Sequence, residues 1–328
     1  MSLKLKFRVF TVLLVITFLI IPVSLTFAET ANYVYDSLNR LIKVEYGDGK
    51  VVEYIYDEVG NLLETKVIST CPQNGTVICI DTNEVEHSYS SLQSAIDASG
   101  AGWKITVGPG TYNELVNISG KSDLTIKGCN RPMVNGRFNL SQANNIVIDG
   151  FDIIASSGDN AITMLGGNNS SENVTLSNNF IHGADIEHSG ISAARDNPEL
   201  YILDNHIYEN GRNGVVFIDA SGGMHYLKRN IIEYNGWNGV WVARDHDILL
   251  EDNTISHNGT RTGTTGGRYG VIRERTTGTG NPQGITLINN TITCNNGEEI
   301  EGKSTKDLGN YDQMIDNTDS GNVTGCQP

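Results

Sequence analysis

Basic side chains are scarce in this sequence. Its 328 residues contain 23 Lys and Arg against 38 Asp and Glu, which gives a formal net charge of −15. Nucleic acids and anionic membrane surfaces attract proteins through positive charge, so the electrostatic term has the wrong sign for both partners. The composition therefore predicts no nucleic-acid partner.

Proline, aromatic and hydrophobic residues are also few. The sequence has 7 prolines, 7% aromatic and 38% hydrophobic residues, whereas glycine reaches 36 residues. This hydrophobic content is low for a compact chain of this length and too high for a disordered one. A compact α/β enzyme is therefore disfavoured.

Only five cysteines are present, and none has the CxxC or histidine spacing of a zinc site. They are Cys71, Cys79, Cys129, Cys294 and Cys326. In an exported protein they can form disulfides, and the odd number leaves at least one unpaired. Proximity in the sequence favours Cys71 with Cys79 and Cys294 with Cys326.

One long apolar run lies at the N-terminus. Three basic side chains occur in residues 1–8, the apolar run 9–21 follows, and a small-x-small sequence ends at Ala28. This pattern predicts a secretory signal peptide over 1–28, cleaved after Ala28, and hence a secreted or cell-surface protein. The alternative is a membrane anchor, but the run is shorter than the ~20 residues of a spanning helix, and no lipidation cysteine follows the cleavage site. Cleavage leaves 20 basic against 38 acidic side chains and no membrane span in the mature chain.

A short sequence occurs twice after this segment. YVYD at 33–36 recurs as YIYD at 54–57, and Asp48-Gly49 between the copies is a hairpin turn signal. The pattern resembles the YD repeat of the Rhs family, whose units build large β-sheet shells from many copies. Two copies cannot build a shell, so we expect residues 29–69 to form a small β-hairpin appendage or contact surface, with 70–87 as a linker.

From residue 88 the pattern changes to a short helix and short strands. An amphipathic helix is expected over 92–96, followed by strands at 104–107 and 123–126. A helix of one or two turns placed before stacked strands covers the open end of a solenoid, which would otherwise expose backbone groups and core side chains.

A unit of about 25 residues then repeats. It reads apolar-x-x-Asn-x-Ile, and its asparagines are 26, 25, 23 and 37 residues apart at Asn179, Asn205, Asn230, Asn253 and Asn290. Phe151 takes the asparagine position in a preceding unit. Each unit has a second strand that starts with a glycine, at Gly190, Gly214, Gly239 and Gly270.

Short strands that repeat without intervening helices bury their apolar faces best when each coil stacks on the one before it. We therefore predict an all-β fold, a right-handed parallel β-helix over residues 88–302, with equivalent residues about 4.8 Å apart. An inward asparagine at a fixed turn then forms a ladder of amides that bond from coil to coil. Residues 303–328 are expected to form a C-terminal tail or cap.

The first coil, ITVGPGTYNE at 105–114, and the repeats resemble the pectin-lyase-like superfamily of right-handed β-helix proteins, including its uncharacterised exported members. The resemblance covers residues from about 88 to about 300. It implies polysaccharide lyases, hydrolases, esterases and epimerases, and also binding or adhesive proteins, so it does not fix a reaction. In that superfamily the substrate groove lies outside the strands that follow the long loops, which here begin at the four glycines.

Alignment on these glycines places a charged side chain five residues after each of them. These side chains should stack as a column: Arg195, Asp219, Arg244 and Arg275. One reading is a surface ion-pair ladder, worth about 0.2–1 kcal/mol per pair. The other is a site for a uronate-containing polysaccharide, in which one arginine pairs with the sugar carboxylate and another acts as the base at the neighbouring carbon. Calcium would bind at Asp196, Asp219 and Asp245 in that case.

An aromatic surface is expected next to this column. Trp241 lies in an outward row of the same strands, Trp237 lies in the adjoining loop, and Glu274 precedes Arg275. We assign these three as candidate substrate-binding residues; the alternative is that a neighbouring loop covers Trp241.

Two functions remain open. The arginine column favours a lyase or epimerase that acts on an acidic polysaccharide, with Arg244, Arg195, Arg275 and Asp219 as candidate catalytic residues. The YD repeats, and the absence of the Gly-His-Gly and Arg-x-Lys signatures of polygalacturonases, favour a non-catalytic glycan-binding or adhesive surface protein.

Overall fold

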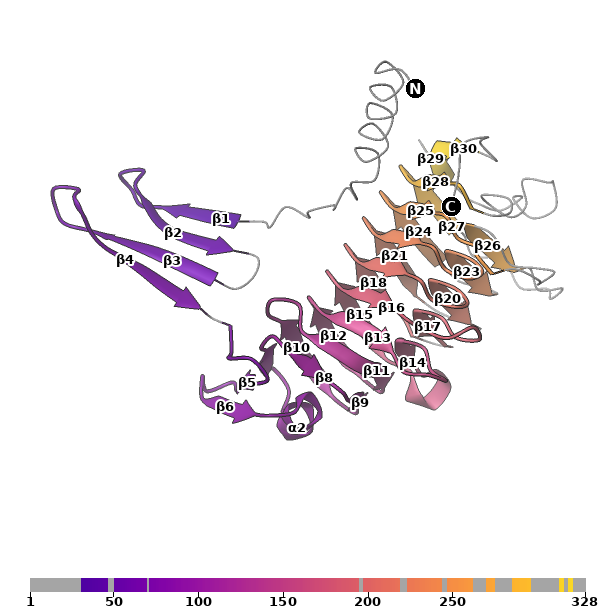
Figure 1. Ribbon diagram of the computed structural model, residues 1–328, viewed down its shortest axis with the longest axis horizontal. Helices are drawn as coiled ribbons and strands as arrows, with labels where there is room; N and C mark the ends of the chain where they lie inside the picture. Colours follow the sequence, from indigo (N-terminus) through magenta and orange to yellow (C-terminus); the bar gives the residue numbers. More distant parts are fainter. Residues whose placement is uncertain are drawn as a thin grey trace, which may run out of the picture. The chain divides into compact units, whose positions relative to one another are not determined.

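The computed structural model describes residues 31–46, 50–69, 71–194, 197–218, 223–243, 247–261, 270–274, 285–295, 313–315 and 318–320. The chain divides between Ile68 and Ser69 into two compact units, and the described residues of both form β-strands with very little helix, as predicted (Figure 1). The expected signal peptide, 1–28, lies outside the described residues. Among the described residues, none of the helices combines the length and the apolar character that a membrane span requires.

The first unit is an antiparallel sheet of four strands in sequence order. Its strands are β1 (Ala31–Tyr35), β2 (Leu41–Tyr46), β3 (Lys50–Tyr56) and β4 (Leu62–Ser69). Each YD repeat supplies one hairpin, β1 with β2 and β3 with β4, and the pairing of β2 with β3 joins the two hairpins. The expected hairpin segment is therefore a pair of hairpins, and the turn signal Asp48-Gly49 lies outside the described residues.

The aspartate of each repeat closes its turn. Asp36 accepts the backbone N–H groups of Leu38 and Arg40, both at 2.9 Å, through one carboxylate oxygen. Asp57 makes the same pair of contacts in the second repeat. An aspartate that bonds its own backbone two and four residues further on fixes a tight turn, which explains why the repeat is written Tyr-x-Tyr-Asp.

The second unit opens with a cap. It comprises β5 (Val77–Ile80), β6 (Glu86–Tyr89) and α2 (Leu92–Ala98). The Ser91 side chain accepts the Ser94 N–H at the start of α2, and the Glu114 carboxylate accepts the Leu92 N–H at 3.1 Å. The residues of α2 that face the solenoid are buried, namely Leu92, Ala95 and Ile96. The predicted helix cap is confirmed.

The solenoid that follows has three faces, each a column of parallel strands that pair in register from coil to coil. The first face comprises β7 (Lys104–Val107), β10 (Ser122–Gly128), β12 (Asn144–Asp149), β15 (Glu172–Ser177), β18 (Leu200–Leu203), β21 (Met224–Lys228), β24 (Asp247–Glu251), β27 (Ile285–Ile288) and β29 (Gln313–Ile315). The second face comprises β8 (Thr111–Tyr112), the first half of β11 (Met133–Ser141), β13 (Asp152–Ala155), β16 (Phe180–His182), β19 (His206–Tyr208), β22 (Ile231–Glu233), β25 (Thr254–Ser256), β28 (Thr291–Thr293) and β30 (Thr318–Ser320).

The third face comprises β9 (Leu115–Ser119), the second half of β11, β14 (Ile162–Met164), β17 (Ile191–Ala193), β20 (Val215–Ile218), β23 (Val240–Ala243) and β26 (Val271–Glu274). The alternating side chains that point inward from all three faces form one continuous apolar core. The only helical turn between these strands in the described chain is the 3-10 turn η1 (Gly167–Asn169). The predicted solenoid is confirmed, and β29 and β30 continue its first and second faces into the segment expected to be a tail.

The predicted asparagine ladder is present. The Asn205 amide donates to Asn230 Oδ1 at 3.1 Å, and the Asn230 amide donates to Asn253 Oδ1 at 2.9 Å. Phe151 occupies the predicted position before the ladder, and its backbone N–H donates to Asn179 Oδ1. A second ladder, which the repeat did not predict, runs through Asn210, Asn235, Asn258 and Asn295. The two ladders flank four strands of the second face, β19, β22, β25 and β28.

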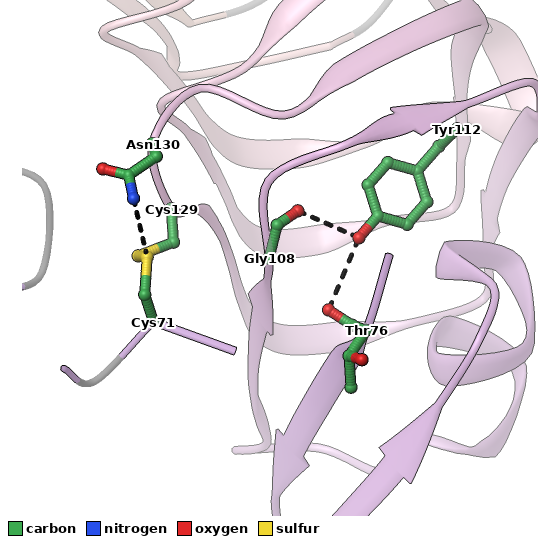
Figure 2. Close-up of a disulfide and its surroundings, with 6 residues drawn as sticks. All are labelled: Cys71, Thr76, Gly108, Tyr112, Cys129 and Asn130. Carbon is green, nitrogen blue, oxygen red and sulfur yellow. Dashed lines mark hydrogen bonds between the residues drawn. A yellow bond between two sulfur atoms is a disulfide. The ribbon is translucent and has the colours of Figure 1, made fainter. Parts of the chain in front are cut away.

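A disulfide joins Cys71 to Cys129, with their Cα atoms 5.6 Å apart (Figure 2). The expected pairing of Cys71 with Cys79 is wrong. Cys79 points inward from β5 into the core and is a buried free thiol, whereas Cys129 follows β10, which stacks two strands away from β5 through β7. Cys294 is also disulfide-bonded, and its partner lies outside the described residues.

Candidate functional site

Glycines precede the last four strands of the third face, as the repeat predicted. β17, β20 and β23 follow directly after Gly190, Gly214 and Gly239. A Cβ atom at Gly214 would lie 2.7 Å from the carbonyl oxygen of Gly239 and 2.9 Å from the side-chain nitrogen of Asn235. The coils therefore approach one another too closely for any other residue at this turn.

The loops before these glycines stack on one another and form one corner of the solenoid. The backbone N–H of Arg212 donates to the His188 carbonyl at 2.9 Å, and the N–H of Trp237 donates to the Arg212 carbonyl at 2.6 Å. In the next coil the N–H of Arg261 donates to the Gly236 carbonyl at 3.0 Å. Four side chains from successive coils thus lie in one row, which we call the corner row: His188, Arg212, Trp237 and Arg261.

Arginines lie over tryptophans in the corner row. The guanidinium carbon of Arg212 is 4.8 Å from the centre of the Trp237 ring and 5.2 Å from that of Trp241. The guanidinium carbon of Arg261 is 5.7 Å from the Trp237 ring. The side chains of these two arginines and two tryptophans are half-buried. These are cation–π distances, and together they make a surface that is both flat and positively charged.

Two donors of this cluster are buried without a hydrogen-bond partner in the described part of the chain, Arg212 Nε and Trp237 Nε1. A buried donor without an acceptor costs about 1–3 kcal/mol, so both groups gain from an acceptor supplied by a ligand. Arg261 differs, because it donates to the Ile186 carbonyl at 2.7 Å and pairs with Glu187 at 3.2 Å.

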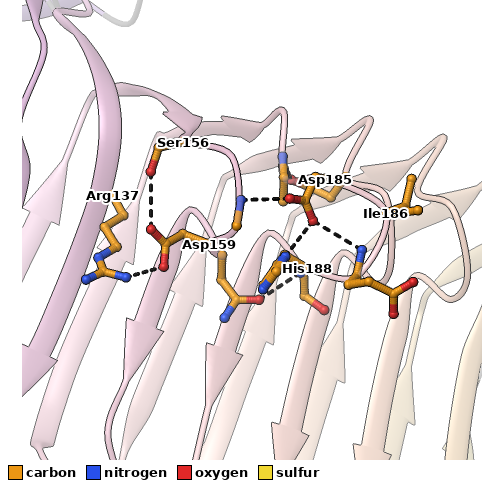
Figure 3. Close-up of polar contacts among 12 residues, drawn as sticks. Arg137, Ser156, Asp159, Asp185, Ile186 and His188 are labelled. Atoms are coloured by element: carbon orange, nitrogen blue, oxygen red, sulfur yellow. Dashed lines mark hydrogen bonds and ion pairs between the residues drawn. The ribbon is translucent and has the colours of Figure 1, made fainter.

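A histidine and an aspartate meet at the same corner (Figure 3). His188 Nδ1 lies 2.5 Å from Asp185 Oδ1, and the other oxygen of Asp185 accepts the Gly158 N–H at 2.7 Å. These hydrogen bonds, the one from His188 foremost, hold the pKa of the Asp185 carboxyl below its usual range. Near this pair, Asp159 forms an ion pair with Arg137. The corner therefore presents an imidazole held by a carboxylate, one coil before the backbone of Arg212.

The structure brings together both predicted tryptophans, Trp237 and Trp241, and adds Arg212 between them. The predicted register of the third face is confirmed, because Trp241 pairs with Val216 on one side and with Ile272 on the other. The outward row that contains Trp241 is less open than expected, because its neighbour Val216 in the preceding coil is only 3% exposed. Trp241 is half-buried, since the loop residue Arg212 lies over its ring.

The charged column stays a prediction. Its members and the predicted calcium ligands lie outside the described residues: Arg195, Asp196, Asp219, Arg244, Asp245 and Arg275. The backbone of Glu274 belongs to β26 and pairs with Ala243, and the role of its side chain in substrate binding stays a prediction. Within the described residues, no group of three or more His, Cys, Asp or Glu side chains has the arrangement of a metal site.

Arg212 was not predicted, although the sequence carries a signal for it. Residues 210–214 read NGRNG and residues 235–239 read NGWNG. Both asparagines of each motif are buried, and they bond to the equivalent asparagines of the neighbouring coil. Alignment of the two motifs places Arg212 beside Trp237, which alignment on the glycine alone does not reveal.

Comparisons with known proteins agree with this architecture. The family model of the right handed beta helix region matches residues 114–272, and that of the RHS repeat matches residues 35–70. No curated protein matches the chain in sequence.

Three solved structures are similar to the chain. A mutant of the periplasmic alginate epimerase AlgG matches with 14% identity and a TM-score of 0.40, over 64% of this chain and 50% of the epimerase. Pectate lyase Pel9A matches with 14% identity and a TM-score of 0.41, over 61% of this chain and 63% of the lyase. The A-module of the mannuronan C-5 epimerase AlgE4 from Azotobacter vinelandii matches with 18% identity and a TM-score of 0.39, over 64% of each chain. The chain thus spans half of the first protein and less than two-thirds of the other two.

The stacked coils and the two family models lead to the same assignment. The chain is a right-handed parallel β-helix protein that carries RHS-type repeats in its N-terminal part.

Proposed function

We propose that the corner row binds an acidic polysaccharide. The observation that carries the proposal is the pair of buried donors, Arg212 Nε and Trp237 Nε1, beside two indole rings. A guanidinium pairs with a carboxylate through two parallel hydrogen bonds, and an indole ring offers a flat apolar surface with one polar edge. A uronate sugar has both features, a carboxylate and a ring face.

We extend the proposal to processing of the bound polysaccharide, of the lyase or epimerase type. His188 is the base that this corner offers, because Asp185 holds its imidazole in one orientation. Removal of the proton next to the sugar carboxylate starts both reactions; a lyase then expels the linking oxygen and an epimerase returns a proton to the other side. The predicted column around Arg244 remains the second candidate for this base.

The alternative function is non-catalytic glycan binding or adhesion at the cell surface. Exposed tyrosines on the YD sheet, Tyr33 and Tyr35, favour it, because large exposed aromatic side chains are typical of contact surfaces.

We also propose that the protein is exported, with residues 1–28 removed. The disulfide between Cys71 and Cys129 supports export, because disulfides persist in oxidising compartments. Mass spectrometry of the secreted protein should give an N-terminus at Glu29. A secreted form that keeps residues 4–8 would contradict the proposed cleavage.

Calorimetric titration tests the binding site. Oligomers of galacturonate and of alginate should bind, and a neutral oligosaccharide of the same length should not. Trp237→Ala and Arg212→Gln should each lose most of this affinity. Arg229→Gln is the matched control, because Arg229 is an exposed arginine that pairs with Asp204 at the junction of the first and second faces. Equal affinity in all three variants would refute the site.

An activity assay separates processing from binding. Pectate, alginate and glycosaminoglycans are incubated with the protein, with and without calcium, and the unsaturated lyase product is followed by ultraviolet absorbance. The same incubations in D₂O, read by nuclear magnetic resonance, detect the proton exchange of an epimerase. Binding without either product would favour the adhesive function, and His188→Gln should abolish any product that forms.

A further inference from the structure

The two YD repeats contact each other through a defined junction. Tyr56 donates its hydroxyl hydrogen to the Leu41 carbonyl at 3.0 Å, from β3 to β2. The guanidinium carbon of Arg40 lies 4.9 Å from the centre of the Tyr56 ring, and Arg40 also donates to the Asp57 carbonyl at 3.4 Å. A tyrosine of one repeat is thereby held by the turn and the strand of the other.

Each outer edge of the sheet presents one half of the same junction. The repeats are offset by 21 positions, so Tyr35 on β1 corresponds to Tyr56, and Leu62 on β4 corresponds to Leu41. Tyr35 is 56% exposed and Leu62 is 51% exposed, whereas their equivalents in the junction are half-buried. Tyr33 on β1 and Leu63 on β4 are exposed as well, whereas their equivalents in the junction, Tyr54 and Ile42, are half-buried.

We propose that β1 of one chain pairs with β4 of a second copy of this chain, in the register that β2 and β3 use within the chain. In the junction, Lys43 pairs with Glu53 and Val44 with Val52. The same register would place Glu64 of one copy opposite Asn32 of the second copy and Thr65 opposite Ala31. Within the described residues, β1 and β4 are the two edge strands of their sheet. Edge strands offer backbone donors and acceptors, so this pairing extends an existing antiparallel sheet.

The contact is heterologous, because the two copies use different edges. Each copy therefore keeps one free edge after pairing, and association continues head to tail as the concentration rises. The intermolecular junction has Asn61 at the position of Arg40. Asn61 reproduces the contact of Arg40 with the turn aspartate, since it donates to Asp57 Oδ2 at 2.8 Å, but an amide supplies no cation over the tyrosine ring. The pairing between copies is accordingly weaker than the pairing between repeats.

Sedimentation velocity of the secreted chain over a wide concentration range tests the proposal. The parent protein should form species of increasing mass, and Asn61→Arg should shift this association to lower concentration by restoring the cation. Tyr35→Ala removes the contact side chain of the β1 edge, and Leu62→Asp places a charge on the β4 edge. Because every contact needs one intact edge of each kind, each variant alone should stay monomeric. Leu38→Ala is the matched control, because Leu38 is an exposed apolar residue of the turn and belongs to neither edge.

Mixing the two damaged variants gives the decisive result. The intact β4 of Tyr35→Ala should pair with the intact β1 of Leu62→Asp, so the mixture should form a heterodimer that grows no further. Circular dichroism of each variant confirms that it is folded. A parent that is monomeric at all concentrations would overturn the proposal. Self-association of either single variant would overturn it as well, because it would reveal pairing of like edges or contact through the β-helix.

Discussion

Arg212 and Trp237 contact each other through a backbone hydrogen bond and through their side chains. The Trp237 N–H donates to the Arg212 carbonyl at 2.6 Å, and the guanidinium carbon of Arg212 lies 4.8 Å from the centre of the Trp237 ring. Successive coils of a β-helix are spaced by about 4.8 Å, close to the distance at which flat groups stack. The stacking of coils therefore holds the two side chains in place before a ligand arrives, which lowers the entropy lost on binding.

Loss of the guanidinium at the corner should weaken binding of acidic glycans. We expect Arg212→Ala to reduce the affinity for oligouronates roughly tenfold, about 1.4 kcal/mol, because one charge-assisted contact is lost. The thermal midpoint should change little, because removal of the unpaired buried Nε offsets the loss of the contacts with the Trp237 and Trp241 rings. Calorimetry and thermal melting of the same preparation check both parts.

The predicted column has its own test in Arg244, which lies outside the described residues. If the column binds the sugar carboxylate, Arg244→Ala should abolish binding or turnover and leave the thermal midpoint nearly unchanged. If the column is an ion-pair ladder, the midpoint should shift slightly and affinity should not change. Unchanged affinity in Arg244→Ala, together with a loss in Arg212→Ala, would assign the ligand to the corner row.

The sequence predicted the solenoid because inward positions repeat at nearly constant spacing. Phe151 and the ladder from Asn179 to Asn290 could be placed from the repeat alone, since a fixed period sets the register of every coil. The second ladder was missed, because Asn210 and Asn235 lie in glycine-rich loops that do not alternate as a strand does. The pairing of Cys71 with Cys129 was missed for a different reason: the two meet only after β10 has stacked on β7.

The ladder asparagines should be costly to replace. The Asn230 side chain donates to the Ile202 carbonyl at 2.8 Å and to Asn253 Oδ1 at 2.9 Å, and it accepts from Asn205. Asn230→Leu leaves these buried partners unpaired, so we expect a loss of about 1–3 kcal/mol for each group in the free energy of unfolding.

Urea unfolding measures the effect of Asn230→Leu. The control is Asn135→Leu on β11, where the exposed Asn135 amide donates to Asn113 at 2.9 Å and water can replace the bond. An equal loss of unfolding free energy in both variants would contradict the prediction, because it would mean that burial of the ladder hydrogen bonds adds no stability.

The disulfide between Cys71 and Cys129 should contribute to the stability of the capped end. It closes a loop with a sequence separation of 58 residues, for which the chain-entropy model gives about 4 kcal/mol. Replacing both cysteines by serine should lower the unfolding free energy by up to this amount, as read from urea titration. A variant as stable as the parent would show that the unfolded chain gains little freedom when the bond is absent.

The buried thiol of Cys79 should resist alkylation in the folded protein. Burial raises its pKa to about 11, so the reactive thiolate is nearly absent at neutral pH, and the core blocks access to it. Iodoacetamide followed by peptide mass spectrometry should label Cys79 only after unfolding. Rapid labelling at neutral pH without denaturant would contradict its position inside β5.

His225 should make the β-helix sensitive to acid. It lies in β21, pairs in register with Ile248 of β24, is 1% exposed and stacks on Phe217 with ring centres 5.0 Å apart. Burial lowers its pKa to about 4 from an ordinary value of 6.5, because the core disfavours the charged imidazolium. The unfolded chain therefore binds a proton between pH 6.5 and pH 4 that the folded protein does not bind.

This difference fixes the sign of the pH dependence. The contribution of His225 is fully present above pH 6.5 and is lost progressively as the pH falls toward 4, by up to about 3 kcal/mol. His225→Leu places an apolar side chain at the same inward position and should remove this part of the pH dependence of the unfolding free energy.

Urea titrations of the parent and of His225→Leu at pH 8, 7, 6 and 5 test this prediction. The values at pH 8 and 7 are the internal reference, because the difference in unfolding free energy between the two proteins should stay nearly constant there. If the parent and the variant lose stability in parallel from pH 7 to pH 5, the imidazole of His225 is protonated without cost, and its place in the apolar core of β21 is wrong.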